Sequence, residues 1–108
     1  MKIALSKSEL ERYDRQMLVP GWGEKGQRRL KSAKVVVIGA GGLGCPASLY
    51  LTAAGIGELV IVDREKFELN NLNRQVLGWQ KDIGHLKAEA AAEKLRKLNS
   101  DIKIQPLT

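Results

Sequence analysis

A glycine-rich turn, followed about 20 residues later by a carboxylate, is the first feature of this sequence with recognisable chemistry. Gly39, Gly41 and Gly44 fit the pattern G-x-G-x-x-G, and Gly42 is an additional glycine inside it. Glycine is required there because a side chain would clash at the tight turn, at the approach to phosphate groups, or where the following helix meets the strand. Asp63 follows at the position where a carboxylate accepts hydrogen bonds from ribose hydroxyls. These residues predict a nucleotide site, against the alternative of a structural turn with a capping aspartate.

The segment after Asp63 is rich in amide and cationic side chains. Arg74 offers a planar fork of donors that suits phosphate oxygens, and Lys87 lies near the start of the next expected helix, where the helix dipole favours anions. With Asn71 and Gln75 alongside, these side chains predict a site for a triphosphate. The glycine turn and Asp63 alone do not distinguish an ATP-using enzyme from an NAD-dependent dehydrogenase. The alternative, an NAD(P)- or FAD-binding oxidoreductase domain, would leave Arg74 and Lys87 without a role.

Two apolar segments, residues 35–38 and 59–62, must position this chemistry. Their lack of polar alternation is typical of parallel strands that are covered on both faces. Between them we expect a helix that begins near Leu43, tolerates Pro46 in its first turn, and ends at Gly55 as a C-cap glycine. A right-handed crossover then places the two strands side by side and parallel.

The sequence patterns that predict the remaining helices and strands are weaker. Ser8 and Glu11 have the spacing of a capping box, which predicts a helix from Glu9 to about Met17. This helix has few apolar residues, so we expect it to be poorly buried and to pack as an arm on another surface. Further along, the patterns predict a short basic helix at 27–32, a long loop from Arg64 to Gly84, a helix at about 86–98, and a third strand at 102–104 that Pro106 interrupts.

Composition narrows the class of protein. A length of 108 residues, with 44% apolar and 28% charged residues, indicates one globular domain or part of one. No apolar run approaches the roughly 20 residues that span a bilayer, and the N-terminus lacks the layout of a signal peptide. We therefore expect a cytoplasmic protein with no membrane partner.

Charge and cysteine content exclude two further kinds of site. The net charge of +6 comes from positive residues interspersed with acidic ones, and the two Trp, two Tyr and one Phe form no stacking platform. We therefore expect no nucleic-acid partner. The single cysteine, Cys45, can form neither an internal disulfide nor a structural zinc site, and we expect it to have a packing role.

Short motifs along nearly the whole chain resemble the HesA/MoeB/ThiF family, which is related to the ubiquitin-activating enzymes. In order, they are Arg12-Tyr13-Asp14-Arg15-Gln16, Gly26-Gln27, Gly39-Ala40-Gly41-Gly42-Leu43-Gly44, Asp63-Arg64-Glu65, Asn71-Leu72-Asn73-Arg74-Gln75 and Gly84-His85-Leu86-Lys87. The resemblance implies adenylylation. ATP and the C-terminal glycine carboxylate of a ubiquitin-like sulfur-carrier protein would react to give an acyl-adenylate and pyrophosphate.

The resemblance also implies roles for individual residues. Gly42 would lie at the nucleotide, with Gly39, Gly41 and Gly44 forming the turn, and Asp63 would hold the ribose. The further contacts to ATP would come from Asn70, Asn71, Leu72, Asn73, Arg74 and Lys87. Arg15 would reach the phosphates in the partner subunit's site, which implies a homodimer. Attack of a carboxylate on the α-phosphate builds negative charge, which Arg15, Arg74, Lys87 and Mg²⁺ would stabilise without a protein nucleophile.

The fold implied is α/β: the N-terminal half of a Rossmann-like, doubly wound parallel sheet with strand order 3-2-1 in residues 34–108, preceded by a helical arm in residues 1–33. The family domain is much longer than this chain. Absent are an aspartate that helps to hold Mg²⁺, the Cys-x-x-Cys motifs that bind zinc in many members, and the surface that docks the carrier protein. Phe67 also replaces the small aliphatic residue that is usual there.

A nucleotide crevice in such a sheet needs a fourth strand on the far side of the first one. With order 3-2-1, residues 35–38 lie at an edge although their composition is that of a central strand. We therefore expect this chain to be the N-terminal part of a larger enzyme, or to be completed by another chain, and to be inactive alone. A third possibility is a non-catalytic interaction module with the same fold.

Overall fold

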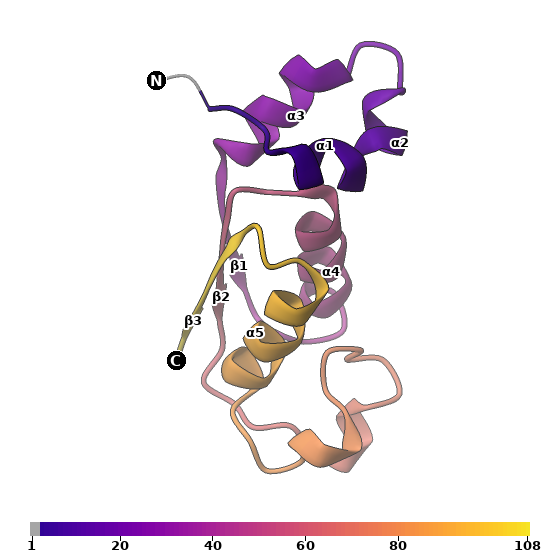
Figure 1. Cartoon of the computed structure of the whole chain (residues 1–108). Helices are drawn as coiled ribbons and strands as arrows, with labels where there is room; N and C mark the ends of the chain where they lie inside the picture. Colours follow the sequence, from indigo (N-terminus) through magenta and orange to yellow (C-terminus); the bar gives the residue numbers. More distant parts are fainter. Residues whose placement is uncertain (1–2) are drawn as a thin grey trace.

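Three parallel strands form the central sheet of the protein. The computed structural model describes residues 3–108. The strands are β1 (Lys34–Ile38), β2 (Glu58–Val62) and β3 (Lys103–Leu107), in the order β1-β2-β3 (Figure 1). Val36 lies opposite Val60 in the parallel register. The α/β class and the strand order 3-2-1 are thus confirmed.

Two crossover helices, α4 (Gly44–Ala54) and α5 (Lys87–Leu98), cover one face of this sheet (Figure 1). Gly55 ends α4 in the left-handed conformation with φ +95°, as the C-cap prediction requires. The core between helices and sheet consists of small and branched apolar side chains. Its fully buried members include Cys45, Leu59, Ile61, Ala88, Ala91, Ala92 and Leu95.

The prediction that β1 is covered on both faces is wrong for the part of the chain that the structure describes. Val36 is 52% and Ile38 84% exposed. The reason is topological: both right-handed crossovers advance in the same direction across the sheet, from β1 to β2 to β3, and therefore place their helices on the same face. Helices reach the second face only where the strand order reverses. The second face of the edge strand β1 is therefore open, whereas Val60 on the same face of β2 is 4% exposed.

Three helices precede the sheet: α1 (Lys7–Arg12), α2 (Asp14–Met17) and α3 (Gly23–Lys31). The capping box lies at Ser6 and Glu9, two residues before the predicted pair, because Glu9 is also held by an ion pair with Lys31. The predicted helix from Glu9 to Met17 is interrupted at Tyr13, and α3 begins four residues earlier than predicted.

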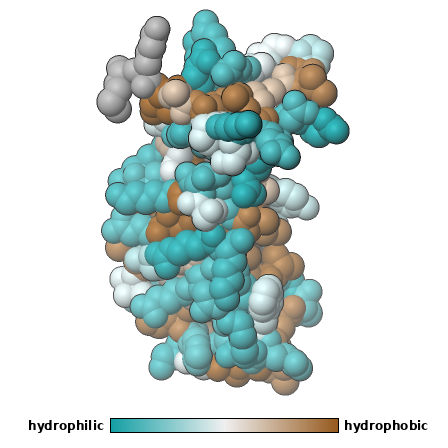
Figure 2. Space-filling model, in the orientation of Figure 1, coloured by the Kyte–Doolittle hydropathy of each residue, from teal (hydrophilic) through white to brown (hydrophobic). Residues whose placement is uncertain are grey.

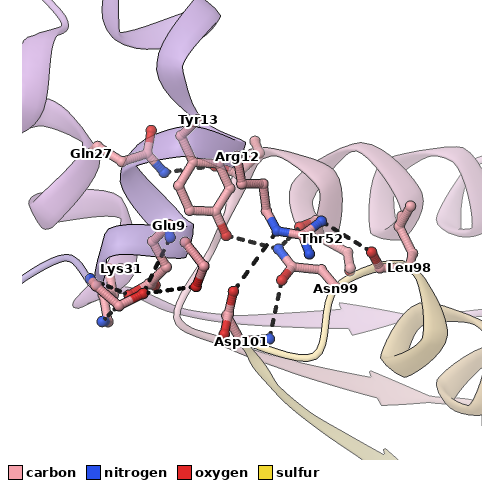
Figure 3. A network of polar contacts seen from close by, with 12 residues as sticks. Glu9, Arg12, Tyr13, Gln27, Lys31, Thr52, Leu98, Asn99 and Asp101 are labelled. Carbon is pink, nitrogen blue, oxygen red and sulfur yellow. Dashed lines mark hydrogen bonds and ion pairs between the residues drawn. The ribbon is translucent and has the colours of Figure 1, made fainter.

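Tyr13 anchors these helices to the rest of the fold (Figure 3). Its side chain is 2% exposed and packs against Gly55, and its hydroxyl accepts a hydrogen bond of 2.8 Å from Asn99 Nδ2. Asn99 Nδ2 also donates to the Thr52 carbonyl, and Gln27 Nε2 donates to the Ala54 carbonyl. The prediction of a poorly buried arm is therefore wrong at Tyr13. The arm is attached by buried polar groups, which a count of apolar residues does not detect.

The segment between β2 and α5 is more ordered than the predicted loop. It contains the short 3₁₀ helices η1 (Leu69–Asn71) and η2 (Gln80–Asp82). A buried ion pair between Asp82 and Lys94 joins η2 to α5. Strand β3 continues through Pro106, because an edge strand has no neighbour on its outer side that needs the missing N–H.

The surface is divided by polarity. Hydrophilic side chains cover most of the face formed by α5, whereas hydrophobic side chains gather along the side that carries α4 (Figure 2). On that helix Tyr50 is 72% exposed, and Leu43, just before it, is 89% exposed. None of the helices between residues 3 and 108 has both the length and the apolarity that a bilayer span requires.

Candidate nucleotide-binding site

An open cleft of about 560 Å³ lies at the carboxyl ends of β1 and β2. Its walls include Ile38 and Gly39 from the end of β1, and Asp63, Arg64 and Glu65 from the end of β2. The carboxyl ends of parallel strands are where open α/β sheets bind ligands. The glycine turn and the predicted ribose carboxylate thus meet at one cleft.

The glycines of the turn fall into two groups. Gly39 has φ +101°, and a Cβ on Gly44 would lie 1.7 Å from the Gly39 carbonyl oxygen, so the fold itself requires both. The fold does not require glycine at positions 41 and 42. A Cβ on Gly42 would meet only Arg74 among the described residues, at an ordinary distance of 3.6 Å. These two glycines leave open space before α4 that a side chain could otherwise fill.

Helix α4 begins beside this space without a side-chain cap. Its N-cap residue, Leu43, makes no side-chain hydrogen bond, and its first turn contains no acidic residue. In the first turn of α4 the Cys45 N–H donates to the Gly41 carbonyl at 3.0 Å and Pro46 has no N–H, so an anion there would interact mainly with the positive end of the helix dipole. The start of α4 is therefore suited to an anion.

Asp63 connects the glycine turn to the end of β2. Its Oδ2 accepts a hydrogen bond of 2.8 Å from the Ala40 N–H, and its Oδ1 accepts one of 2.7 Å from the Glu65 N–H. Asp63 therefore caps backbone N–H groups of the turn, which is the structural role that the sequence also allowed. A carboxylate oxygen has a second lone pair, so these bonds leave acceptor capacity for ribose hydroxyls, and that role stays a prediction.

Arg74 extends over Gly42 and is oriented by its own segment. Its Nη1 donates to the Asn70 carbonyl at 3.1 Å and to Asn73 Oδ1 at 2.9 Å. Asn71 acts within the turn instead, because its Oδ1 accepts from the Glu68 N–H at 2.9 Å and its Nδ2 donates to Asn70. Asn70, Asn73 and Arg74 are therefore placed together at the glycine turn, while Asn71 and the neighbouring Leu72 shape the loop.

Lys87 is the most unusual group of the site. Its side chain is only 7% exposed, and its Nζ makes no hydrogen bond within residues 3–108. The nearest carboxylate oxygen, Glu65 Oε1, is 4.0 Å away on a side chain that is 73% exposed. A buried charge without a close partner costs free energy. The site therefore holds a positive charge that an anion would stabilise.

Gln75, which the sequence places alongside Arg74 in the predicted triphosphate site, lies in the interior. The residue is 6% exposed, and its Oε1 is buried without a hydrogen-bond donor among the described residues. Its Nε2 lies 4.0 Å from the position of a Cβ on Gly41. A buried amide oxygen that lacks a donor is rare and is a sign of a missing ligand or water.

Arg15 lies at the other end of the molecule. Its side chain is 90% exposed and, within residues 3–108, forms an ion pair only with its neighbour Asp14. The next residue, Gln16, donates to the carbonyl of Ala54 at the end of α4, whereas the glycine turn precedes the start of α4. A helix of 11 residues is about 16 Å long. Figure 1 shows the two regions at opposite ends of α4, so one chain does not bring Arg15 to the other site residues.

Cys45 lies in the interior next to the glycine turn. Cys45 is fully buried, its Sγ donates to the Ala40 carbonyl at 3.3 Å, and burial raises the pKa of its thiol. This agrees with the packing role expected from the sequence. Among residues 3–108, no group of three or more His, Cys, Asp or Glu side chains could hold a metal ion.

Known proteins resemble this chain along almost its whole length. The sequence model of the ThiF family matches residues 13–108. The SAMP-activating enzyme E1 of Haloferax volcanii is 48% identical over 107 residues, which cover 99% of this chain and 40% of that protein. The adenylyltransferase and sulfurtransferase MOCS3 of Mus musculus is 50% identical over 101 residues, which cover 94% and 22%.

Solved structures give the same result. PaaA superimposes with a TM-score of 0.89 at 34% identity, covering 99% of this chain and 35% of that one. Escherichia coli MccB, solved with ATP, superimposes with a TM-score of 0.83 at 37% identity, covering 94% and 31%. This chain thus spans less than half the length of these curated relatives and solved structures.

Proposed function

This chain belongs to the ThiF family, and on that premise we propose that it is the nucleotide-binding part of an ATP-dependent adenylyltransferase. Its substrate would be the C-terminal glycine carboxylate of a ubiquitin-like sulfur-carrier protein. The relatives named as an E1 enzyme for SAMP and as adenylyltransferases support this class of reaction. The structure of MccB with ATP supports the identity of the nucleotide.

The observation that carries this proposal is the largely buried side chain of Lys87, which has no carboxylate closer than 4.0 Å and whose charge reaches Cys45 in the first turn of α4. Arg74 lies over Gly42 in the glycine turn that precedes the same helix. Two cations and a helix N-terminus suit a ligand with several negative charges, and we propose that they bind the same one. The triphosphate of ATP is such a ligand.

In the proposed reaction, a carboxylate oxygen of the carrier attacks the α-phosphorus of ATP. The bond from that phosphorus to the bridging oxygen breaks and pyrophosphate leaves. Arg74 and Lys87 would stabilise the negative charge that builds on the phosphoryl oxygens and on the leaving group. Mg²⁺, when bound with the phosphates, would neutralise part of the same charge.

We infer that Arg15 acts in the site of a second copy. It is exposed, and α4 separates it from the glycine turn of its own chain. In a homodimer, the arm of one subunit would bring Arg15 to the phosphates of the other. Equal amounts of inactive Arg15→Ala and Lys87→Ala subunits should then regain activity on mixing, because each heterodimer has one intact site. No recovery despite subunit exchange would contradict this inference.

We also propose that these 108 residues form the N-terminal part of a longer protein. Support comes from the coverage of relatives, 40% at most among those named above, and from the exposed Val36 and Ile38 on the edge strand β1. A further strand beside β1 would complete the crevice. The remaining part would carry the docking surface for the carrier and any zinc site. A stable monomer of this length with cooperative unfolding would argue against this.

Titration of the intact protein with Mg²⁺ and ATP, and separately with NAD, tests the proposal. ATP should bind, and Lys87→Ala should weaken its binding about tenfold or more, as expected for loss of a charged contact. Lys97→Ala, which removes an exposed lysine from the same helix, is the matched control and should have no effect. The intact protein should also exchange pyrophosphate into ATP when the carrier is present.

Two outcomes would favour the alternatives. Tight binding of NAD without any response to ATP would indicate an oxidoreductase domain. Binding of ATP without pyrophosphate exchange in the assembled system would indicate a non-catalytic interaction module.

A further inference from the structure

We propose that the aromatic ring of Phe67 positions the ammonium of Lys87 for its anionic ligand. This inference rests on the proposed function, because it assigns a second residue to the grip on the phosphates. Phe67 is a positioning residue here, since it acts through Lys87 and not on the substrate.

The backbone holds Phe67 next to the start of α5. The Phe67 N–H donates to the His85 carbonyl at 3.0 Å, and its carbonyl accepts from the Gly84 N–H at 2.8 Å. The Lys87 N–H in turn donates to the Glu65 carbonyl at 2.9 Å. The two segments that carry Phe67 and Lys87 are thus joined on both sides of the ring, which fixes its position relative to Lys87.

The ring occupies space that Gly78 leaves free. Phe67 is 1% exposed, and a Cβ on Gly78 would lie 2.5 Å from two of its ring carbons. No real Cβ contact is so short, so the ring and any side chain at position 78 exclude each other. The ring therefore sits in a close-fitting site and has little freedom to turn away from Lys87.

The Lys87 Nζ lies 5.6 Å from the centroid of the Phe67 ring. A cation within about 6 Å of an aromatic face is attracted by the ring quadrupole. The ring carries no net charge, so it orders the ammonium without neutralising it. A buried carboxylate in the same place would pair with Lys87 and repel a phosphate. The nearest carboxylate among residues 3–108, that of Glu65, is 4.0 Å away and largely exposed, so it can yield to a ligand.

Fluorination of the ring at position 67 tests this inference. Fluorine withdraws π density and weakens the cation–π attraction while the ring keeps nearly the same size. Suppression of an amber codon at position 67 of the intact protein would supply Phe, 4-fluoro-, 3,5-difluoro- and 3,4,5-trifluorophenylalanine. The probe is ATP with Mg²⁺. We expect Kd to rise stepwise through the series, by about threefold to tenfold at the trifluorinated ring.

The same series in the Lys87→Ala background is the control. If the ring acts through Lys87, fluorination should have no effect once the ammonium is absent, which makes the pair a coupling cycle. Thermal melts of every variant separate packing from positioning, because a purely structural ring would change the melting temperature and leave Kd flat. As an independent readout, the Lys87 Hε protons should be shifted upfield by the ring current, and Phe67→Leu should remove that shift.

The outcomes separate this inference from the proposed function. A flat Kd across the series, combined with weaker binding by Lys87→Ala, would overturn the role of Phe67 and leave the proposed function in place. An equal trend in both backgrounds would also overturn it, since the ring would not act through Lys87. Unchanged ATP binding by Lys87→Ala would overturn both.

Discussion

Replacement of Lys87 by methionine should stabilise the protein and weaken its binding of ATP about tenfold or more. Methionine has a similar length, fills the same buried space and can contact the Phe67 ring through its sulfur. The side chain of Lys87 is 7% exposed and its nearest carboxylate is 4.0 Å away, so without ligand the wild type keeps a weakly paired charge at the edge of its interior. Lys87→Met removes that charge at little cost in packing.

The magnitude follows from opposing terms. Replacing poorly compensated buried ions by apolar residues stabilises proteins by about 1–4 kcal/mol. The lost cation–π attraction, about 0.5–2 kcal/mol, subtracts from this gain. A net increase of about 1 kcal/mol in the free energy of unfolding is therefore expected. Lys97→Met, on the exposed face of the same helix, should stay within about 0.5 kcal/mol of the wild type.

Urea denaturation with and without Mg²⁺ and ATP measures both effects on one protein. ATP at about 100 times the wild-type Kd should stabilise the wild type by about 2.7 kcal/mol, and should stabilise Lys87→Met by about 1.4 kcal/mol or less if its Kd is tenfold higher or more. The ranking of the two proteins should therefore reverse when ATP is added. The reasoning is refuted if Lys87→Met is less stable than the wild type without ligand, or if it gains as much from ATP.

Three further changes test other parts of the structure. Gly44→Ala should destabilise the fold by about 3 kcal/mol in urea denaturation, because its Cβ would overlap the Gly39 carbonyl; a wild-type midpoint would contradict this geometry. Asn99→Ala should cost about 2 kcal/mol and speed amide exchange in the N-terminal helices, since it leaves buried polar groups unpaired; unchanged exchange there would show that the anchor lies elsewhere. Burial opposes ionisation of Asp82, but the hydrogen bonds from Lys94 and the Trp79 N–H, together with the charges of Lys94 and Lys81, outweigh it and hold the pKa of Asp82 below its usual value. Its stabilisation should thus be complete above the unfolded-state pKa of about 3.9 and be lost as pH falls through the lower folded-state pKa, a loss that Asp82→Asn should remove from the acid limb of the stability curve.

Anchoring by buried polar groups explains why the prediction of a poorly buried N-terminal arm is wrong at Tyr13. A helix with few apolar residues is normally poorly buried, and Leu10 is indeed partly exposed. Tyr13 nevertheless lies in the interior because Asn99, a residue 86 positions away, supplies its hydrogen bond. A partner so distant leaves no periodic mark in the sequence around Tyr13.

Local sequence patterns were sufficient to predict the order of the elements and the position of the glycine turn. Strand, turn, helix and strand depend on neighbours in the chain: apolar runs at 35–38 and 59–62, a glycine that must adopt positive φ, and a C-cap glycine. The parallel order of the strands then follows from the handedness of the crossovers. All of these properties are local, so they can be read from spacing and residue type.

The surroundings of each charged or polar group are seen only in the tertiary structure, because they depend on the packing of distant segments. It buried Lys87 without a close anion, engaged both oxygens of Asp63 with backbone amides, and held Arg15 at the far end of α4. It also left one face of β1 open. Burial and pairing depend on which distant segments pack together, and the free energy of a charge depends on those surroundings and not on its position along the chain.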